Sequence, residues 1–320
     1  MRSSRLAATI ALVALLGTQV GCAPLRQARI DPEAPPTEVE VDARERLDHA
    51  TCSGSWSWAL PGAGQLCTGK VVEGAVLSTL AVAELAGALA APGGILSLIS
   101  LVAIQNTWII GVADITLDKQ RAASRLYVPQ EGLDELALAP FNPNVLGETT
   151  VWLGIIGIFG AALVYSNAAV SLLDEPAAEP TAPVMTPSVV EIATIAGVST
   201  ALFTHVAMGE ELLFRGVLQA SLASALDPWS GWAIASLIFG GIHTANAFAL
   251  RPDQRTRYLA VDVPFITLVG SYLGLAFMWN DYALAPPVAI HFWYDTLLTL
   301  GAFIGSGGEL PFSMVWGADF

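Results

Sequence analysis

The chain has 320 residues, of which 54% are hydrophobic and 13% are charged, and its formal net charge is −14. A soluble domain usually carries about a quarter charged residues, so this composition argues against an ordinary soluble protein and indicates a chain that crosses a membrane several times. Many of the acidic residues lie in three polar regions, 31–48, 118–148 and 174–191, which we interpret as solvated segments. Because no basic stripe is present, we expect no nucleic-acid partner.

Residues 1–22 have the pattern of a targeting leader. Arg2 and Arg5 precede an apolar stretch at 6–16, and small residues follow up to Cys22. The Gly-Cys pair at the end resembles the end of a bacterial lipobox, in which the cysteine becomes lipidated. An uncleaved signal anchor is the alternative.

Residues 23–53 are predicted to form a flexible tether. The segment is polar, acidic and proline-containing, and it lacks the apolar periodicity of a packed helix. Cys52, near its end, and Cys67 form a disulfide if this part of the chain faces an oxidising compartment. The alternative is a pair of unpaired small residues. No Cys-x-x-Cys or Cys/His metal spacing is present in the sequence.

Residues 54–113 are predicted to form a membrane hairpin module. Trp56 and Trp58 suit a membrane interface, and the Pro-Gly-Ala-Gly-Gln run at 61–65 interrupts any helix. Two apolar spans follow, at 71–91 and 94–113. The module resembles a small bacterial two-helix membrane module of unknown function, which implies no chemistry.

The remaining chain is predicted to add an all-α transmembrane bundle to this two-helix hairpin. A polar loop at 114–148 leads into a core of about six to eight helices at 149–305, and a short tail at 306–320 follows. With about 20 residues per crossing, we expect seven or eight crossings after the leader. The expected core spans are 149–173, 189–207, 229–250, 258–279 and 282–304, with a shorter helix at 211–225.

Basic residues predict an orientation for these spans. The positive-inside rule places the tight loop at 251–257 and the basic segment at 119–125 in the cytoplasm, and the basic-free loop at 174–188 outside. An exported Cys22 would leave the 119–125 segment outside instead. The sequence leaves this conflict open.

Three short polar patterns occur in three separate apolar segments between residues 189 and 304. Ionisable groups at membrane depth are costly, and where they occur they are usually functional. A purely structural hydrogen-bond network is the alternative, but the combination and order of the patterns favour a functional site. The patterns are Glu210-Glu211-x-x-x-Arg215, Phe239-x-x-x-His243 and His291-x-x-x-Asp295.

Helix geometry separates the two adjacent glutamates. Glu211 and Arg215 are four residues apart, so in a helix they lie on one face and can pair. Glu210 is rotated away from that face by about 100°. We therefore expect its partner across the bundle, at His243 or His291.

Two other polar residues lie in apolar segments. We interpret Glu84 as a neutral, hydrogen-bonded glutamate, with a functional carboxylate as the alternative. We interpret His205 as a histidine at the membrane interface, and an extension of the polar network around Glu210 is the alternative.

The three patterns, in this order, resemble the CPBP family, which comprises CAAX proteases and bacteriocin-processing enzymes and is also called the Abi family. Its pattern is Glu-Glu-x-x-x-Arg, then Phe-x-x-x-His, then His-x-x-x-Asn or Asp, and the resemblance covers about 189–304. It implies an intramembrane endopeptidase with an eight-helix bundle and a glutamate-activated water in a cavity open to the bilayer. It also implies Glu210 as the base, His243 as its partner on the water, and His291 and Asp295 as stabilisers of the oxyanion.

The chemistry of peptide hydrolysis agrees with these roles. The reaction needs a base for water, a proton donor for the leaving amine and donors for the oxyanion. Glu210 can be the base, His243 can position or share the proton, and His291 can donate to the oxyanion. Asp295 donates only when protonated, and its alternative role is to orient His291 through the second ring nitrogen. The residues expected to support the site are Glu211, Arg215 and Phe239.

A metal is the other mechanism that these residue types allow. Two histidines and two carboxylates can hold zinc, with Glu210, His243 and His291 as the candidate ligands. The sequence has no His-Glu-x-x-His pattern, and ligand types alone do not determine a metal. We therefore expect that no cofactor is required, with zinc as the alternative.

These observations predict a multi-pass protein of the bacterial inner (cytoplasmic) membrane. Its expected activity is that of an intramembrane endopeptidase, similar to CAAX prenyl protease 2, with the lipid bilayer and a membrane-anchored or membrane-adjacent protein or peptide as partners. The alternatives are a non-catalytic immunity or scaffold protein and a proton-coupled transporter. Three titratable groups at membrane depth argue against a scaffold, and the lack of an inverted repeat argues against a transporter.

Overall fold

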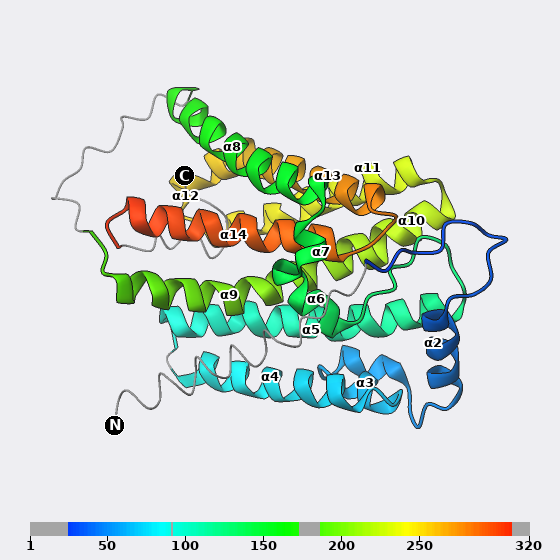
Figure 1. Cartoon of the computed structure of the whole chain (residues 1–320). Helices are drawn as coiled ribbons and strands as arrows, with labels where there is room; N and C mark the ends of the chain where they lie inside the picture. Colours follow the sequence, from blue (N-terminus) through cyan, green and yellow to red (C-terminus); the bar gives the residue numbers. More distant parts are fainter. Residues whose placement is uncertain (1–24, 91, 173–185, 309–320) are drawn as a thin grey trace.

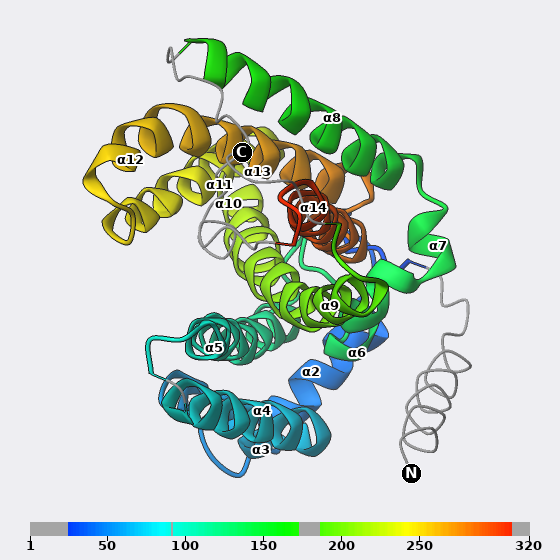
Figure 2. The ribbon, with the colours of Figure 1, turned by 90° about the vertical axis from the view of Figure 1, so that its left-hand side faces the viewer.

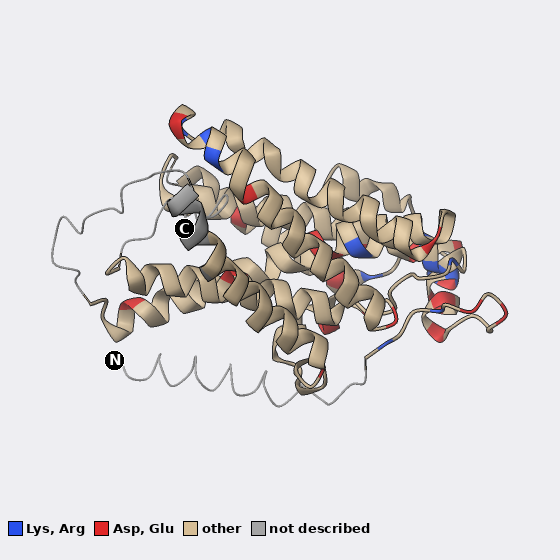
Figure 3. Ribbon diagram, turned by 90° about the horizontal axis from the view of Figure 1, so that it is seen from above, with Lys and Arg blue, Asp and Glu red and all other residues tan. Residues whose placement is uncertain are grey.

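The computed structural model describes residues 25–90, 92–172 and 186–308, and all the regular secondary structure in these residues is helical (Figure 1). The prediction of an all-α, polytopic bundle is therefore confirmed. Charged residues gather mainly at the two ends of the bundle, and few lie along its middle (Figure 3). The predicted leader, residues 1–22, lies outside the described residues, as does most of the predicted tail.

Five helices in the described ranges are long and apolar enough to cross a membrane. Seven or eight crossings were expected. The number is smaller because two predicted helices join into one and because α11 (Pro228–His243) has only 16 residues. α8 (Thr149–Leu172) has 24 residues, but its side chains are described without a gap only over Thr149–Ala162, so it is not among the five. The five are α4 (Val71–Ala90), α5 (Ile95–Ala122), Val189–Ala225, Pro252–Trp279 and α14 (Ala285–Gly305).

The helix that carries the two adjacent glutamates is continuous. α9 (Val189–Glu211) runs through a π-helical stretch, η3 (Leu212–Gln219), into α10 (Ala220–Ala225). The prediction of a break near residue 208 and a separate short helix was wrong. Buried polar side chains in this stretch find partners within the bundle, so their polarity does not end the helix.

The segment at 251–257, expected to be a tight loop, is mostly helical as well. α12 (Pro252–Arg257) begins with a proline, whose missing N–H is tolerated at the first helical position. It continues through a second π-helical stretch, η5 (Tyr258–Asp262), into α13 (Val263–Trp279). A short connection, η4 (Thr244–Phe248), follows α11.

The two basic regions lie at opposite ends of the bundle. Gln120, near the end of α5, donates to Ser221 Oγ of α10 over 2.9 Å, and Ser224 Oγ donates to Leu126 O over 2.6 Å. α10 therefore ends beside the 119–125 segment, whereas α12 lies at the other end (Figure 1). Val189–Ala225 is a single candidate span, so the ends of the bundle lie on opposite sides of a membrane. The prediction that both basic regions face the cytoplasm was therefore wrong.

The predicted tether at 23–53 is structured rather than flexible along its second half. It contains α2 (Glu38–Asp48), which begins with a capping box between Thr37 and Glu40 and packs against α5. Glu40 is fully buried and pairs with Arg29 over 3.3 Å. Caps and ion pairs hold this helix, which is why the search for apolar periodicity missed it.

In the region of the predicted hairpin module, α4 and α5 pack against each other. η1 (Gly54–Trp58) and α3 (Ala63–Cys67) precede α4, and Cys52 and Cys67 form a disulfide. Gly62 has φ = 84°, a left-handed conformation that favours glycine. The second span extends to Ala122, well beyond the predicted end at residue 113.

The core centres on α14, which lies between α8, α9 and α13 (Figure 2). The polar connection between α5 and α8 contains three short helices that pack on one another and on α14. They are α6 (Leu133–Leu138), η2 (Ala139–Phe141) and α7 (Pro143–Leu146). The α4–α5 hairpin contacts this core through α5 and α9.

Candidate active site

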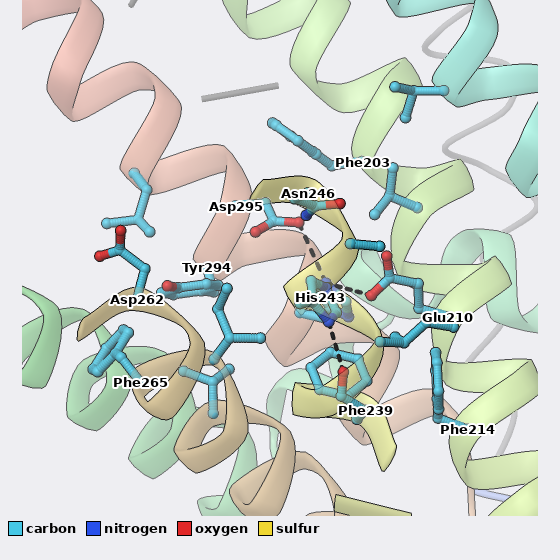
Figure 4. A pocket seen from close by; sticks show the side chains of 18 of the residues that line it. Phe203, Glu210, Phe214, Phe239, His243, Asn246, Asp262, Phe265, Tyr294 and Asp295 are labelled. Atoms are coloured by element: carbon cyan, nitrogen blue, oxygen red, sulfur yellow. Dashed lines mark hydrogen bonds and ion pairs between the residues drawn. The ribbon is translucent and has the colours of Figure 1, made fainter. Parts of the chain in front are cut away.

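A cavity of about 460 Å³ lies inside the bundle. Its walls come from α5, α8, α9, α11, α13 and α14, with η3, η4 and η5 contributing at their junctions, and most of its lining is apolar. The structure brings all four sequence-predicted catalytic side chains to this one cavity, and Figure 4 shows three of them labelled. They are Glu210, His243, His291 and Asp295.

Glu211 and Arg215 form the predicted pair. The Nε atom of Arg215 lies 3.1 Å from Glu211 Oε2, and both side chains are completely buried. Arg215 Nη2 also donates to Gly270 O of α13 over 3.0 Å, and its guanidinium carbon lies 4.7 Å from the centre of the Phe239 ring. Arg215 therefore links the glutamate-bearing helix to α13 and to the second motif, and it lies outside the residues that line the cavity.

Glu211 has a second partner that the sequence analysis missed. Its Oε1 atom lies 2.8 Å from Nδ1 of His291, on α14. One carboxylate oxygen thus binds Arg215 and the other binds His291. We assign the Nδ1 proton of His291 to the bond with Glu211, because a carboxylate oxygen only accepts. The sequence contained one signal for this contact. The predicted pair of Glu211 and Arg215 uses one oxygen of the Glu211 carboxylate, which leaves the other oxygen for a second partner.

The other ring nitrogen of His291 faces two carboxylates. Its Nε2 lies 3.4 Å from Asp295 Oδ2 and 3.9 Å from Glu210 Oε2. Asp295 was expected either to act on the oxyanion or to orient His291. In the structure Glu211 holds the far side of the ring, and Asp295 lies on the cavity side next to Nε2, beside Glu210.

His243 is the last residue of α11, and its ring is oriented by its own helix. Nδ1 lies 2.7 Å from Phe239 O, one turn earlier, so Nδ1 carries the proton and Nε2 is left as an acceptor. The Phe239 ring packs against His243, with 4.7 Å between ring centres, and lies 6.4 Å from the His291 ring. Phe239 thus contacts both the buried Arg215 and the His243 ring.

Two residues that the sequence analysis did not identify hold the end of α11. Tyr258 OH, on η5, donates to His243 O over 3.0 Å and accepts from Asn246 Nδ2 over 3.1 Å. Tyr258 is buried, and Asn246 lines the cavity (Figure 4). Asn246 lies three residues after His243, in η4, whereas no spacing in the sequence connects Tyr258 to His243, since η5 belongs to another helix.

Glu131 supports the site from outside the spans. Its Oε1 atom accepts from Ala285 N, at the start of α14, over 3.1 Å. The next two residues of α14 are prolines, which have no N–H, so few other donors exist in this turn. Burial raises the pKa of the Glu131 carboxyl to about 7. Glu131 thus caps the helix that carries His291, a role that the sequence analysis missed.

The three candidate zinc ligands, Glu210, His243 and His291, all line the cavity. In the parts of the chain that the structure describes, no group of three or more His, Cys, Asp or Glu side chains is arranged to hold a metal ion. His291 uses both ring nitrogens on carboxylates, and its Nε2 is 3.9 Å from Glu210. Zinc bonds to histidine nitrogen and carboxylate oxygen are about 2.0–2.2 Å long, so two ligands of one tetrahedral zinc ion lie about 3.4 Å apart, and the zinc alternative stays a prediction.

Comparison with known proteins finds a family match in the C-terminal half of the chain. Residues 192–297 match the family model described as type II CAAX prenyl endopeptidase Rce1-like. No curated protein and no solved structure matches the chain. The matched segment contains all three motifs, in agreement with their resemblance to the CPBP and CAAX protease family.

Proposed function

We propose that this multi-pass membrane protein is an intramembrane endopeptidase of the bacterial inner membrane. It hydrolyses a peptide bond of a membrane-anchored or membrane-adjacent substrate. The observation that carries this proposal is the convergence of Glu210, His243 and His291, from three separate helices, on one cavity inside the bundle. Ionisable side chains at this depth are rare in structural networks and frequent at functional sites.

Glu210 and His243 are proposed to activate the water. Glu210 takes a proton from the water, and the unprotonated Nε2 of His243 orients the same water by accepting its second hydrogen. The resulting nucleophile forms a bond to the carbonyl carbon of the substrate, and the carbonyl electron pair moves to the oxygen. This requires a scissile bond that lies at the polar end of the cavity.

His291 and Asp295 are proposed to stabilise the oxyanion. Both ring nitrogens of His291 face carboxylates, so a doubly protonated ring satisfies Glu211 on one side and presents an N–H to the cavity on the other. That N–H lies beside Asp295, where it can turn to the developing negative oxygen. The C–N bond then breaks, and Glu210 passes its proton to the leaving amine, which restores the starting state.

The cavity walls support a membrane substrate. Aromatic and aliphatic side chains line it on every side of the polar cluster, and Figure 4 shows several of these rings. An apolar lining lowers the local dielectric and strengthens the electrostatic interactions at the polar end. It also suits a peptide whose side chains are apolar, as expected for a segment drawn from the bilayer or its surface.

The proposal is tested by cleavage of quenched fluorescent membrane peptides with purified protein. We expect Glu210→Gln and His243→Ala to reduce the rate at least a hundredfold. The matched control is Glu191→Gln, on the same helix. There the glutamine keeps the capping box with Ser188 and lies far from the cavity. Equal rates in the control and the Glu210 variant would contradict the proposal and favour the scaffold or transporter alternative.

A further inference from the structure

One wall of the cavity comes from outside the family-matched segment. α5, the second helix of the hairpin module, contributes Val102, Gln105, Asn106 and Ile109. Their spacing of three, four and seven residues places them on one face of the helix. We propose that this face binds the peptide backbone of the substrate, with Asn106 accepting a hydrogen bond from a substrate N–H. The inference rests on the proposed function and gives the hairpin module a role in it.

Asn106 has an unused acceptor. Its side chain is 3% exposed, and its Nδ2 donates to Val102 O over 3.0 Å. Its Oδ1 atom has no hydrogen-bond partner within the described part of the chain. A buried acceptor without a donor is costly and is uncommon in folded proteins. A peptide substrate carries a backbone N–H at every residue except proline, and one of these can supply the missing donor.

The unused acceptor lies next to the proposed base. A Cβ atom built on Gly209 would lie 2.5 Å from Asn106 Oδ1, so the amide packs directly on the α9 backbone at this glycine. Gly209 immediately precedes Glu210. Oδ1 is covered by the α9 backbone in this state, so the Asn106 amide turns about its Cβ–Cγ bond toward the cavity to accept the substrate N–H, which is then held close to the bond that Glu210 attacks.

Gln105 adds a second amide to the same face. It is exposed and lines the cavity, in a helix whose preceding turns are apolar apart from serines. A side-chain amide offers both a donor and an acceptor, which match the C=O and N–H of an extended peptide. A helical substrate has no free backbone groups in its middle, so this face binds an unwound, extended segment.

Contacts on two sides of the cavity-facing residues hold α5 in place, and the first set lies beside Asn106. Thr107, beside Asn106, donates to Glu84 Oε1 of α4 over 3.0 Å, and the same oxygen lies 3.6 Å from His205 Nε2 of α9. Glu84 is thus hydrogen-bonded, as predicted, and His205 pairs with it rather than with the catalytic cluster. The three side chains tie α4, α5 and α9 together at the level of the cavity.

The Pro-Gly-Ala-Gly-Gln run secures the other end of α5. Gln65, the last residue of the run, donates from Nε2 to Gly111 O over 2.8 Å and to Asp114 Oδ2 over 3.0 Å. Lys70 lies 2.5 Å from Asp114 Oδ1. These bonds fix the rotation of α5 about its axis, which decides whether Asn106 faces the cavity or the lipid. The motif therefore supports the substrate wall.

A backbone-ester scan of a cleaved peptide tests the proposed bond. An ester replaces one N–H by oxygen and removes a single donor. With the wild-type protein, we expect one ester position near the cleavage site to lower kcat/KM about tenfold, mainly through KM. With Asn106→Ala, the amide and ester peptides should be cleaved equally at that position. The control is Thr116→Val, on the same helix, whose hydroxyl donates to Val112 O and which does not line the cavity.

The inference is overturned if every ester position has the same effect on the wild type and on Asn106→Ala. A general loss of folding would instead lower the melting temperature of Asn106→Ala below that of Thr116→Val. The ratio of the cleavage rates of the amide and ester peptides can be measured even then. If the wild type cleaves no peptide, the proposed function fails, and a second measurement decides this inference separately.

The second measurement is photo-crosslinking of a biotinylated apolar peptide in detergent micelles. A benzoylphenylalanine at position 105, in a Glu210→Gln background, should become labelled, because this side chain lines the cavity. The same group at the exposed position 108, which does not line the cavity, should not. Equal labelling at both positions, or none at position 105, would overturn the proposal that α5 binds the peptide.

Discussion

Glu211 Oε1 lies 2.8 Å from His291 Nδ1, which joins the first motif directly to the third. The same carboxylate binds Arg215 through its other oxygen over 3.1 Å. One buried side chain thus holds an arginine and orients a histidine whose other nitrogen faces Asp295 in the cavity. The second glutamate of the motif is therefore the structural centre of the site, while the first faces the cavity.

Removing the charge of Glu211 should destabilise the protein. Glu211→Gln keeps the shape of the side chain but leaves the fully buried Arg215 without a counter-charge. We expect the free energy of unfolding to fall by about 3 kcal/mol. The measurement is unfolding in mixed detergent micelles, followed by tryptophan fluorescence. The double variant Glu211→Gln/Arg215→Met should recover part of the loss, and a purely additive double variant would contradict the pairing argument.

Tyr258 should act on the rate through the position of His243. Tyr258→Phe removes the hydroxyl that donates to His243 O over 3.0 Å. We expect kcat to fall about tenfold with little change in KM, because His243 loses the hydrogen bond that holds its backbone at the end of α11. Tyr272→Phe is the matched control, since its hydroxyl also donates to a backbone carbonyl, but that carbonyl belongs to Thr150, which does not line the cavity. Equal losses of kcat in both variants would count against a positioning role.

Glu131 should make stability depend on pH. Its pKa is raised from 4.5 to about 7 in the folded protein, so the folded state holds this proton more tightly than the unfolded state does. The stabilisation is complete below about pH 4.5 and is lost as the pH rises through about 7. A shift of this size corresponds to about 3 kcal/mol.

Glu131→Gln removes this pH dependence in a measurable way. The glutamine oxygen can still accept from Ala285 N, but it carries no charge at any pH. We expect the variant to melt at a higher temperature than the wild type at about pH 8, and the two to converge near pH 5. Melting curves that stay parallel across this range would show that Glu131 does not titrate between these values.

The disulfide and the basic residues together predict the orientation. The bond between Cys52 and Cys67 indicates that the end of the bundle with α2 and α3 faces an oxidising compartment. α12 lies at the opposite end, so the basic residues at 251–257 face the cytoplasm, in agreement with the positive-inside rule (Figure 1). This arrangement also suits an exported N-terminus.

Cysteine labelling in intact cells checks this orientation. A membrane-impermeant maleimide should label Leu226→Cys, at the exposed end of α10, without permeabilisation. It should label Arg251→Cys, which is exposed at the other end, only after permeabilisation. The reverse pattern would place the disulfide in the cytoplasm and contradict the assignment.

Much of the candidate site could be predicted from residues close in sequence. The pair of Glu211 and Arg215 follows from i, i+4 spacing, because the helix itself brings the two side chains together. The same reasoning put His291 and Asp295 on one face, 3.4 Å apart in the structure. The membrane-spanning character of the chain followed from composition alone.

Contacts between helices that are distant in the sequence could not be predicted from local spacing. Glu131 caps α14 from a connection that was predicted to be a polar loop. Tyr258 donates to His243 O from η5, which belongs to another helix. The continuity of Val189–Ala225 and the presence of α2 were also missed, since hydropathy reports burial poorly where ion pairs and caps hold the backbone.

The sequence by itself determined an all-α membrane protein and the identity of the motif residues. It also determined which of these residues share a helix face, because backbone geometry sets the angle between neighbours in one helix. Only the tertiary structure decided that Glu211 binds His291 and that α5 closes the cavity. Those contacts depend on how each helix is rotated and placed against the others, which side-chain packing across the whole bundle decides.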